Sequence, residues 1–316
     1  MKYLRLYIVL LALVPMLCLQ AQNAVRGVSF DVGVAAGYSA LGHAIAADAY
    51  PDLTASTAGD YGYSAHLGVN IFFTHIFGIS LGCDFDRYGG AIRLSGQQTW
   101  DGVTDTDGEL YKHTLSINSW RERQQQLYLS PQVLLLFAIP ANTVRVQIGV
   151  GAAYNCGIQA SYSAKGDLVH TGFYAPWNLT LHDVDAHGFY HNDAFHPKGM
   201  LIDRGQYLSI LAKVGVLIPV ARNLDLSLHL VGKYAVYANP RTTVTAGGDS
   251  PIGFREDATN ISAEALQAHA FMPSYSSLFK TPIATGTYHP LFVGLEIGIR
   301  YTIPFRRHYP CWCTDD

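Results

Sequence analysis

A strict alternation of side chains over nineteen residues, from Val144 to Tyr162, constrains this chain more than any other feature. Non-polar or weakly polar residues hold every even position, whereas polar residues, alanine and glycine hold the odd ones. A period of two predicts a β-strand with one apolar face. Nineteen residues are too many for an ordinary globular strand, but they suit a slanted membrane crossing with an extension beyond the lipid. The even positions are Val144, Val146, Ile148, Val150, Ala152, Tyr154, Cys156, Ile158, Ala160 and Tyr162.

The same period recurs in seven other segments, so we expect eight strands in total. These segments span residues 28–38, 61–73, 79–85, 127–139, 208–218, 224–234 and 293–303. Alternation alone also fits a soluble lipocalin-like barrel or a sandwich, in which the apolar face points inward. The composition of the opposite face distinguishes a membrane barrel from these soluble folds, because that face consists mainly of Gly, Ser, Ala, Asn and Gln. Small residues suit the narrow interior of an eight-stranded barrel, so the apolar face is expected to contact lipid.

Composition and backbone solvation support this orientation. Charged residues make up only 14% of the chain, compared with roughly 25% in soluble domains, which leaves few to coat strands that face water. An open sheet in lipid would leave a row of backbone groups unpaired, each at a cost of several kcal/mol. We therefore expect the last strand to pair with the first.

The connections between the expected strands fall into two classes. Three are tight, at 74–78, 140–143 and 220–223, and four are long, near 39–60, 89–121, 163–205 and 238–288. Tight turns at one rim and long loops at the other are typical of outer-membrane barrels, whose termini lie in the periplasm. The sequence thus predicts an all-β fold: an eight-stranded antiparallel up-and-down transmembrane β-barrel with long extracellular loops and short periplasmic turns.

Two of the long connections contain further structure of their own. Segments 91–100 and 109–120 flank the turn-like residues 101–108, and they are expected to extend strands three and four as a hairpin above the membrane. Residues 262–271 (SAEALQAHAF) predict a short helix with Ser262 as its N-cap. Outward aromatic residues are expected to form one belt near each rim.

The chain is expected to divide into a signal peptide (1–21), a barrel domain (22–305) and a periplasmic tail (306–316). Lys2 and Arg5 precede a long apolar run, with cleavage after Ala21; a lone N-terminal membrane helix is the alternative. Cleavage removes these two cations and changes the formal charge from −3 to −5. A negative chain argues against nucleic acid as a partner.

The cysteines predict no disulfide framework. Cys83 and Cys156 lie on strands three and five, with strand four between them, so they are about 10 Å apart, too far to bridge. Cys311 and Cys313 could pair locally, bind a metal or remain free.

The pattern resembles the OmpA-like outer-membrane barrels. Within them, LYLSPQVLLLFAIP followed by VRVQIGVGAAYNCG is similar to the "outer membrane protein beta-barrel domain" of Bacteroidota, the PorT-like group, and FVGLEIGIRY resembles its closing strand. The resemblance implies recognition by the barrel-assembly machinery. Two features depart from it: Phe305 is followed by eleven more residues, and no peptidoglycan-binding domain is found. The matching positions are Tyr128, Pro131, Gly149, Gly151, Glu296, Gly298, Tyr301 and Ile303.

Acidic and basic residues on the inward face are nearly equal in number. Unpaired charges in a narrow interior would each cost several kcal/mol, so the balance predicts a salt-bridged plug rather than an open pore. We expect Glu296 to pair with Lys213 or Lys233. A conductive lumen is the alternative. The acids are Asp31, Asp84, Asp86, Asp225 and Glu296; the bases are Arg145, Lys213, Lys233 and Arg300, with His66 and His229 beside them.

The third long connection carries two candidate binding features. One is a group of imidazoles and carboxylates that could hold zinc or copper, although their spacing matches no established motif. The other is a group of aromatic side chains that could contact a glycan, a peptide or a protein, or could pack the loop against itself. The first group comprises His170, His182, His187, His191, His196, Asp183, Asp185 and Asp193; the second comprises Phe173, Tyr174, Trp177, Phe189, Tyr190 and Phe195.

These features predict a monomeric outer-membrane protein without enzymatic activity or a cofactor. Its surface loops are expected to serve recognition, adhesion or envelope scaffolding, with an envelope or host surface partner. A small passive channel and, from the PorT-like resemblance, an accessory role in protein export are the alternatives. No catalytic motif appears, and nothing singles out His113 or His289 as rim catalysts.

Overall fold

The structure, a computed structural model, describes residues 27–45, 52–105, 107–141, 143–184, 187, 189, 191–195, 198–200, 206–238 and 284–305. Within these ranges the chain is almost entirely β-strand, and the 3-10 turn η2 (Ala175–Trp177) follows β6. None of the helices in the described part of the chain is long and apolar enough to cross a membrane.

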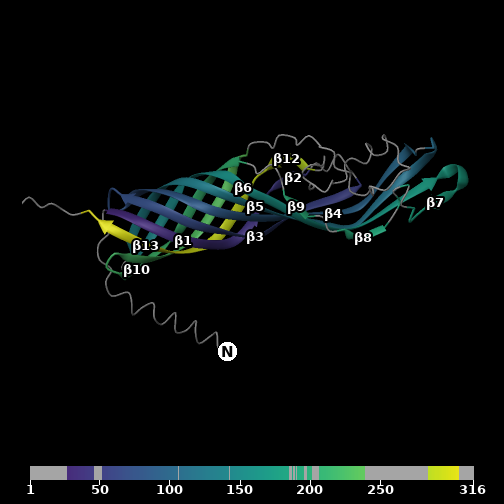
Figure 1. Cartoon of the computed structure of the whole chain (residues 1–316). Coiled ribbons are helices and arrows are strands. Elements are labelled where there is room, and N and C mark those ends of the chain that lie inside the picture. Colours follow the sequence, from purple (N-terminus) through teal and green to yellow (C-terminus); the bar gives the residue numbers. More distant parts are fainter. Residues whose placement is uncertain are drawn as a thin grey trace, which may run out of the picture.

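Eight antiparallel strands form a closed ring (Figure 1). Each ring strand pairs with the next one along the chain, and β13 returns to pair with β1. The expected eight-stranded ring and the expected pairing of its last strand with its first are both confirmed, whereas the short strands outside the ring were not predicted. The ring consists of β1 (Gly27–Ala40), β3 (Leu53–Phe72), β4 (Phe77–Thr104), β5 (Leu110–Ala141), β6 (Val144–Tyr174), β10 (Gln206–Ala221), β11 (Leu224–Ala238) and β13 (Leu291–Pro304).

The three predicted tight links are present. Between β3 and β4 only residues 73–76 lie outside the strands, and two residues separate both β5 from β6 and β10 from β11. The first link is a Thr-centred turn, in which the Thr74 hydroxyl oxygen accepts hydrogen bonds from the backbone N–H groups of Ile76 (3.2 Å) and Phe77 (2.8 Å). These links place the ends of six strands at one rim.

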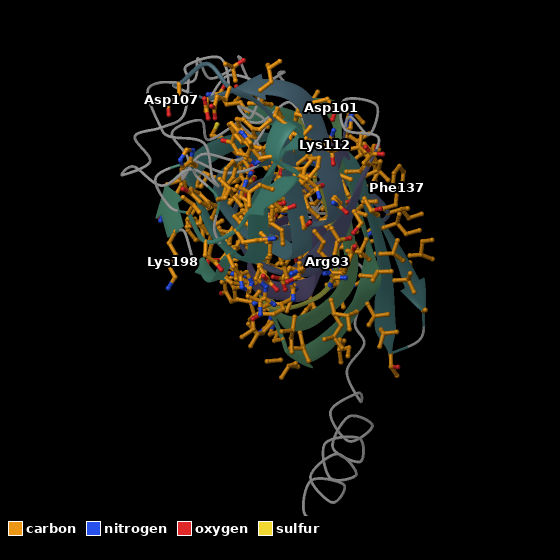
Figure 2. All side chains as sticks on the ribbon, turned by 90° about the vertical axis from the view of Figure 1, so that its right-hand side faces the viewer. Arg93, Asp101, Asp107, Lys112, Phe137 and Lys198 are labelled. Atoms are coloured by element: carbon orange, nitrogen blue, oxygen red, sulfur yellow. The ribbon has the colours of Figure 1, made fainter. Side chains whose placement is uncertain are left out.

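Side chains alternate between buried and exposed along the ring portions of the strands, as the sequence period predicts, whereas the start of β3 and residues 88–92 of β4 do not follow the alternation. On β13, Leu295 is 72% exposed, whereas its neighbour Glu296 is 5% exposed. Figure 2 shows the outward direction of the labelled Phe137 on β5. We call the outward aliphatic residues the apolar belt: Val32, Val34, Leu67, Leu81, Leu129, Val133, Leu135, Val150, Ile210, Val214, Leu228, Leu230, Val293, Leu295, Ile297 and Ile299.

Three strands continue far beyond the ring. β4, β5 and β6 contain 28, 32 and 31 residues, and their outer parts form a sheet that extends to the right in Figure 1. We call this part, together with the start of β3, the distal sheet. Short strands β7 (Leu179–Leu181), β8 (His191–Phe195) and β9 (Lys198–Met200) pair with β6, while β2 (His43–Ile45) pairs with β12 (Ala284–Tyr288).

The extension of β4 and β5 is confirmed, but the interpretation of 163–205 as a loop was wrong for its first twelve residues. Residues 163–174 continue β6, and residues 163–173 pair with β5. The distal sheet also has its own apolar core, in which Trp120 and Ile117 pack with Ile92 and Leu168. The strands therefore remain paired and partly buried outside the ring.

Several expectations lie outside the described residues: the signal peptide (1–21), the helix at 262–271 and the tail with Cys311 and Cys313. Cys83 and Cys156 are free thiols on β4 and β6, with β5 between them. The predicted separation of these two cysteines is therefore consistent with the strand order.

Candidate functional site

The inward face of the ring carries a continuous network of charged side chains. It draws on strands that are not neighbours, so its contacts cross the interior. All eight residues singled out from the sequence lie in it or beside it: Asp31, Asp84, Asp86, Arg145, Lys213, Lys233, Glu296 and Arg300.

Lys233 is the most enclosed cation of the network. Its Nζ donates to Asp84 Oδ2 at 2.5 Å and to Asp86 Oδ1 at 2.7 Å, and all three side chains are almost fully buried. Asp86 also accepts a hydrogen bond from the Ser130 hydroxyl (2.8 Å). Two carboxylates around one ammonium leave a local charge of −1, which the neighbouring groups must compensate.

His66 lies between two of the carboxylates. Its Nε2 is 3.2 Å from Asp31 Oδ2, and its Nδ1 is 2.5 Å from Asp84 Oδ1. The amides of Asn70 and Gln132 donate to the same two aspartates, at 2.9 and 2.8 Å. A doubly protonated imidazolium can donate to an acceptor from each ring nitrogen, so this geometry suits a charged His66.

Lys213 and Glu296 form the ion pair expected from the sequence, with Nζ 2.9 Å from Oε2. His229 Nδ1 is 3.3 Å from the other oxygen of Glu296. Lys233 does not take this role, because it binds Asp84 and Asp86 instead.

The network ends near the rim of tight links. There Arg300 donates to Gln147 Oε1 (2.6 Å) and lies 3.8 Å from Asp31. Arg145 on β6 and Asp225 on β11 form an ion pair at the same rim. Each cation named from the sequence therefore has at least one carboxylate partner.

An aromatic layer, formed by Tyr88, Tyr128, Tyr207 and Phe292, closes the interior on the side of the long connections. All four side chains are 2% exposed or less, and their rings meet edge to face with centroids 5.0–6.4 Å apart. Such contacts add to the burial of apolar area. Sequence reasoning missed this layer, although Tyr88 and Tyr128 have the inward parity of Asp86 and Ser130.

A small cavity lies among the charged side chains inside the ring. The cavity among Asp31, His66, Lys213, Glu296 and Arg300 has a volume of about 10 Å³, which is roughly the space that one water molecule requires. Charged side chains surround this cavity, and the aromatic layer lies between it and the long connections.

The aromatic residues proposed for recognition are not one exposed surface. Tyr174 and Phe189 are buried, where they pack against Tyr111 in the distal sheet. Both rings are therefore packed within the protein, which is the second of the two alternatives that the sequence left open. Burial also raises the pKa of the Tyr174 hydroxyl, which donates to Asp105 Oδ2 at 3.1 Å. Trp177 is 55% exposed and Phe173 half-buried, whereas Tyr190 and the side chain of Phe195 lie outside the described residues.

The histidines of the same region are dispersed. His170 is buried in the distal sheet, with its Nδ1 2.9 Å from His113 Nε2. His191 contacts Asp167 (2.8 Å), and hydrogen bonds from His191 and Asn118 lower the pKa of that carboxyl.

Three further members of the candidate metal group are described by the structure. His182 and Asp183 are exposed, and His187 stacks on Phe189. His196, Asp185 and the side chain of Asp193 lie outside the described residues. Among the residues that the structure describes, no group of three or more metal-ligating side chains is found. His289, the other rim histidine, stacks on Tyr234.

Compared with known proteins, the chain matches no family model and no curated protein. The resemblance to the OmpA-like and PorT-like barrels therefore stays a prediction from the motifs.

Proposed function

We propose that this protein is an outer-membrane β-barrel with a sealed interior, which anchors the distal sheet outside the membrane for recognition, adhesion or envelope scaffolding. The observation that carries the proposal is the apolar belt. Aliphatic side chains surround the ring on its outside, with Val32, Leu67 and Leu295 at 58%, 62% and 72% exposure. A continuous exposed apolar surface of this extent is what hydrocarbon solvates and water does not.

The aromatic residues support the same placement. Phe30 and Tyr301 are register partners near the rim of tight links, and Tyr38 and Tyr61 are register partners near the other rim. Phe30 and Tyr38 bound nine residues of β1, and a tilted strand of about 9–11 residues crosses a membrane. Aromatic side chains favour the two interfaces, so the rings would mark the boundaries of the lipid.

The sealed interior argues against the passive channel. Ion pairs and buried rings occupy the space that a water path would need. The function is therefore assigned to the parts outside the membrane, where the distal sheet offers a rigid surface built on paired strands. The lipid and the barrel-assembly machinery are the partners that this placement implies, with the protein acting as a monomer.

The proposal is tested by expressing the full chain in a Gram-negative host with an epitope inserted at Gly108. This residue lies between β4 and β5 at φ +84°, with open space around it. We expect the protein in the outer-membrane fraction, a shift in gel mobility between heated and unheated samples, and antibody binding to intact cells. A product soluble without detergent would contradict the membrane placement, and an epitope detected only after permeabilisation would contradict the orientation.

A further inference from the structure

The distal sheet has one edge with which no described strand pairs. Residues 53–59 begin β3, and they pair only with residues 90–96 of β4. The pairing of β3 with β1 stops at Asp60, and β2, which follows β1, pairs with β12 instead. At the opposite edge of the sheet, by contrast, β7, β8 and β9 pair with β6. We call the side of residues 53–59 that faces away from β4 the open edge.

The open edge lacks the features that protect sheet edges from further pairing. Natural proteins use charged side chains, proline or bulges for this purpose. Residues 53–59 (LTASTAG) contain neither a charge nor a proline, and the register shift of β3 lies beyond them. The side chains of Thr54, Ser56 and Thr57 are exposed. An uncharged, exposed and extended edge of this kind is suited to accept another strand.

A row of cations crosses the outer face of the sheet and ends at the open edge. Arg93 on β4 is the register partner of Arg121 on β5, and Arg121 is the register partner of Lys165 on β6. Ser56 on β3 takes the next position, opposite Arg93. Like charges in directly opposite positions destabilise a sheet. Within the part of the chain that the structure describes, none of the three cations forms an ion pair, so the row favours a carboxylate beside it.

A strand added at the open edge would bring a side chain to the end of this row. Its residue opposite Ser56 would lie about 10 Å from the backbone of Arg93, which is two strand spacings. Because the Ser56 side chain is small, a glutamate at that position and the long Arg93 side chain can meet above it, and carboxylate and guanidinium groups match in geometry. Asp52 and Asp60 flank the open edge, four residues from Ser56 on either side. The acid is therefore expected at the centre of the added strand.

Apolar surface also borders the open edge. Ala55 is only partly buried against the core of the distal sheet that contains Ile92 and Trp120. A cavity of about 70 Å³ lies where β1 leaves β3, and its lining includes Thr57 from the open edge and Leu41. This volume is roughly half that of an engineered cavity that holds benzene, so it suits a small aliphatic side chain. Aliphatic residues in the added strand would therefore extend the existing packing.

We propose that the open edge binds an extended peptide segment of a partner protein, with a central acidic residue and aliphatic residues at alternate positions. The segment adds one strand to the distal sheet, so that main-chain hydrogen bonds supply affinity and the side chains supply specificity. The proposal rests on the proposed function, in which the distal sheet is the part that meets a partner. It adds the place of contact and the chemistry of that partner.

The test uses the full chain in detergent micelles and a fluorescent peptide of alternating threonine and valine with one central glutamate. The comparison peptide has glutamine at the centre. An exposed ion pair changes affinity by a few-fold, so the glutamate peptide is expected to bind about threefold more tightly to the native protein. In R93Q the two peptides should bind equally. K112Q is the matched control that keeps the preference, because Lys112 is an outward cation of β5 already paired with Asp101 at 3.5 Å; Figure 2 labels Arg93, Lys112 and Asp101.

Hydrogen exchange then locates the bound peptide. The backbone amides of residues 53–59 that face away from β4 should exchange more slowly when peptide is bound, whereas the amides of β6 should not change. Unchanged exchange at residues 53–59 with millimolar peptide overturns the proposal, as does equal affinity of the native protein for the two peptides. Protection of residues 53–59 that rises with protein concentration in the absence of peptide would identify a second copy of this chain as the occupant and would also overturn it.

The result is independent of the membrane placement. Peptide binding in micelles requires no bilayer, so loss of the peptide site leaves the proposed placement intact. A product that is soluble without detergent contradicts the placement alone.

Discussion

Lys213 on β10 and Glu296 on β13 are 83 positions apart in the chain, yet Nζ lies 2.9 Å from Oε2 inside the ring. Their strands are not neighbours, because β11 lies between them. The pair therefore spans the intervening strand β11 on the inner face of the sheet, and it depends on the register of β10 and β13 against β11. Both side chains are buried, so removal of one partner leaves the other without compensation in a site that water hardly reaches.

We expect Glu296→Gln to lower the free energy of unfolding by about 3 kcal/mol, because Lys213 would keep a buried charge without its partner. The measurement is urea-induced unfolding in detergent micelles. The double variant K213M/E296M should lose less stability than Glu296→Gln, since neither charge is then left alone. A double variant less stable than the single one would contradict this reasoning.

The filled interior predicts no conductance in planar lipid bilayers. Lys233→Ala removes the ammonium between Asp84 and Asp86, which would then repel each other in the interior. We expect this variant either to admit water and conduct small currents or to unfold at lower urea concentration than the native protein. Steady conductance by the native protein, or a variant as closed and as stable as the native one, would refute the sealed interior.

The aromatic layer makes a separate prediction about packing. Tyr88→Ala is expected to lower the free energy of unfolding by about 3 kcal/mol, because it opens a cavity among Tyr128, Tyr207 and Phe292. Tyr61→Ala serves as the control, because Tyr61 is 70% exposed on the outside of the ring, and its loss opens no internal cavity, so it should cost less stability than Tyr88→Ala. Equal effects of the two substitutions would show that the layer does not pack as described.

Ring closure between β1 and β13 depends on the absence of a side chain at Gly37. A Cβ there would lie 2.1 Å from the Val293 carbonyl oxygen and 2.3 Å from Gly294 Cα, both backbone atoms. Gly37→Ala is therefore expected to reduce the yield of folded protein, measured as the fraction with heat-sensitive gel mobility. Gly232→Ala is the matched control on β11, because no atom lies within 4 Å of its added Cβ. A normal yield for Gly37→Ala would contradict the close approach of the two strands.

The period of two was sufficient to predict the ring strands, because burial on one face alone dictates alternation. It was insufficient for residues 163–174. The outward positions of that segment mix Lys165 and Asp167 with Val169, while its inward positions mix Gly166 with Leu168, so neither face has a consistent polarity. The pairing with β5 nevertheless keeps the segment extended.

The sequence predicted which charges face inward but left two partners open for Glu296. Strand parity determines the direction of a side chain, whereas its partner across the interior depends on the stagger of all eight strands. Lys213 and Lys233 both have inward parity, and the register brings Lys213 to Glu296 and Lys233 to the two aspartates of β4.

The most direct measurement concerns the environment of Leu295, the most exposed residue of the apolar belt. In a variant without native cysteines, a nitroxide label at Leu295→Cys is compared with one at Lys112→Cys in the distal sheet, in lipid bilayers. We expect the Leu295 label to collide more with dissolved oxygen than with a water-soluble nickel complex, and the Lys112 label to show the reverse. Nickel accessibility at Leu295 as high as at Lys112 would contradict the claim that the outer face of the ring contacts lipid.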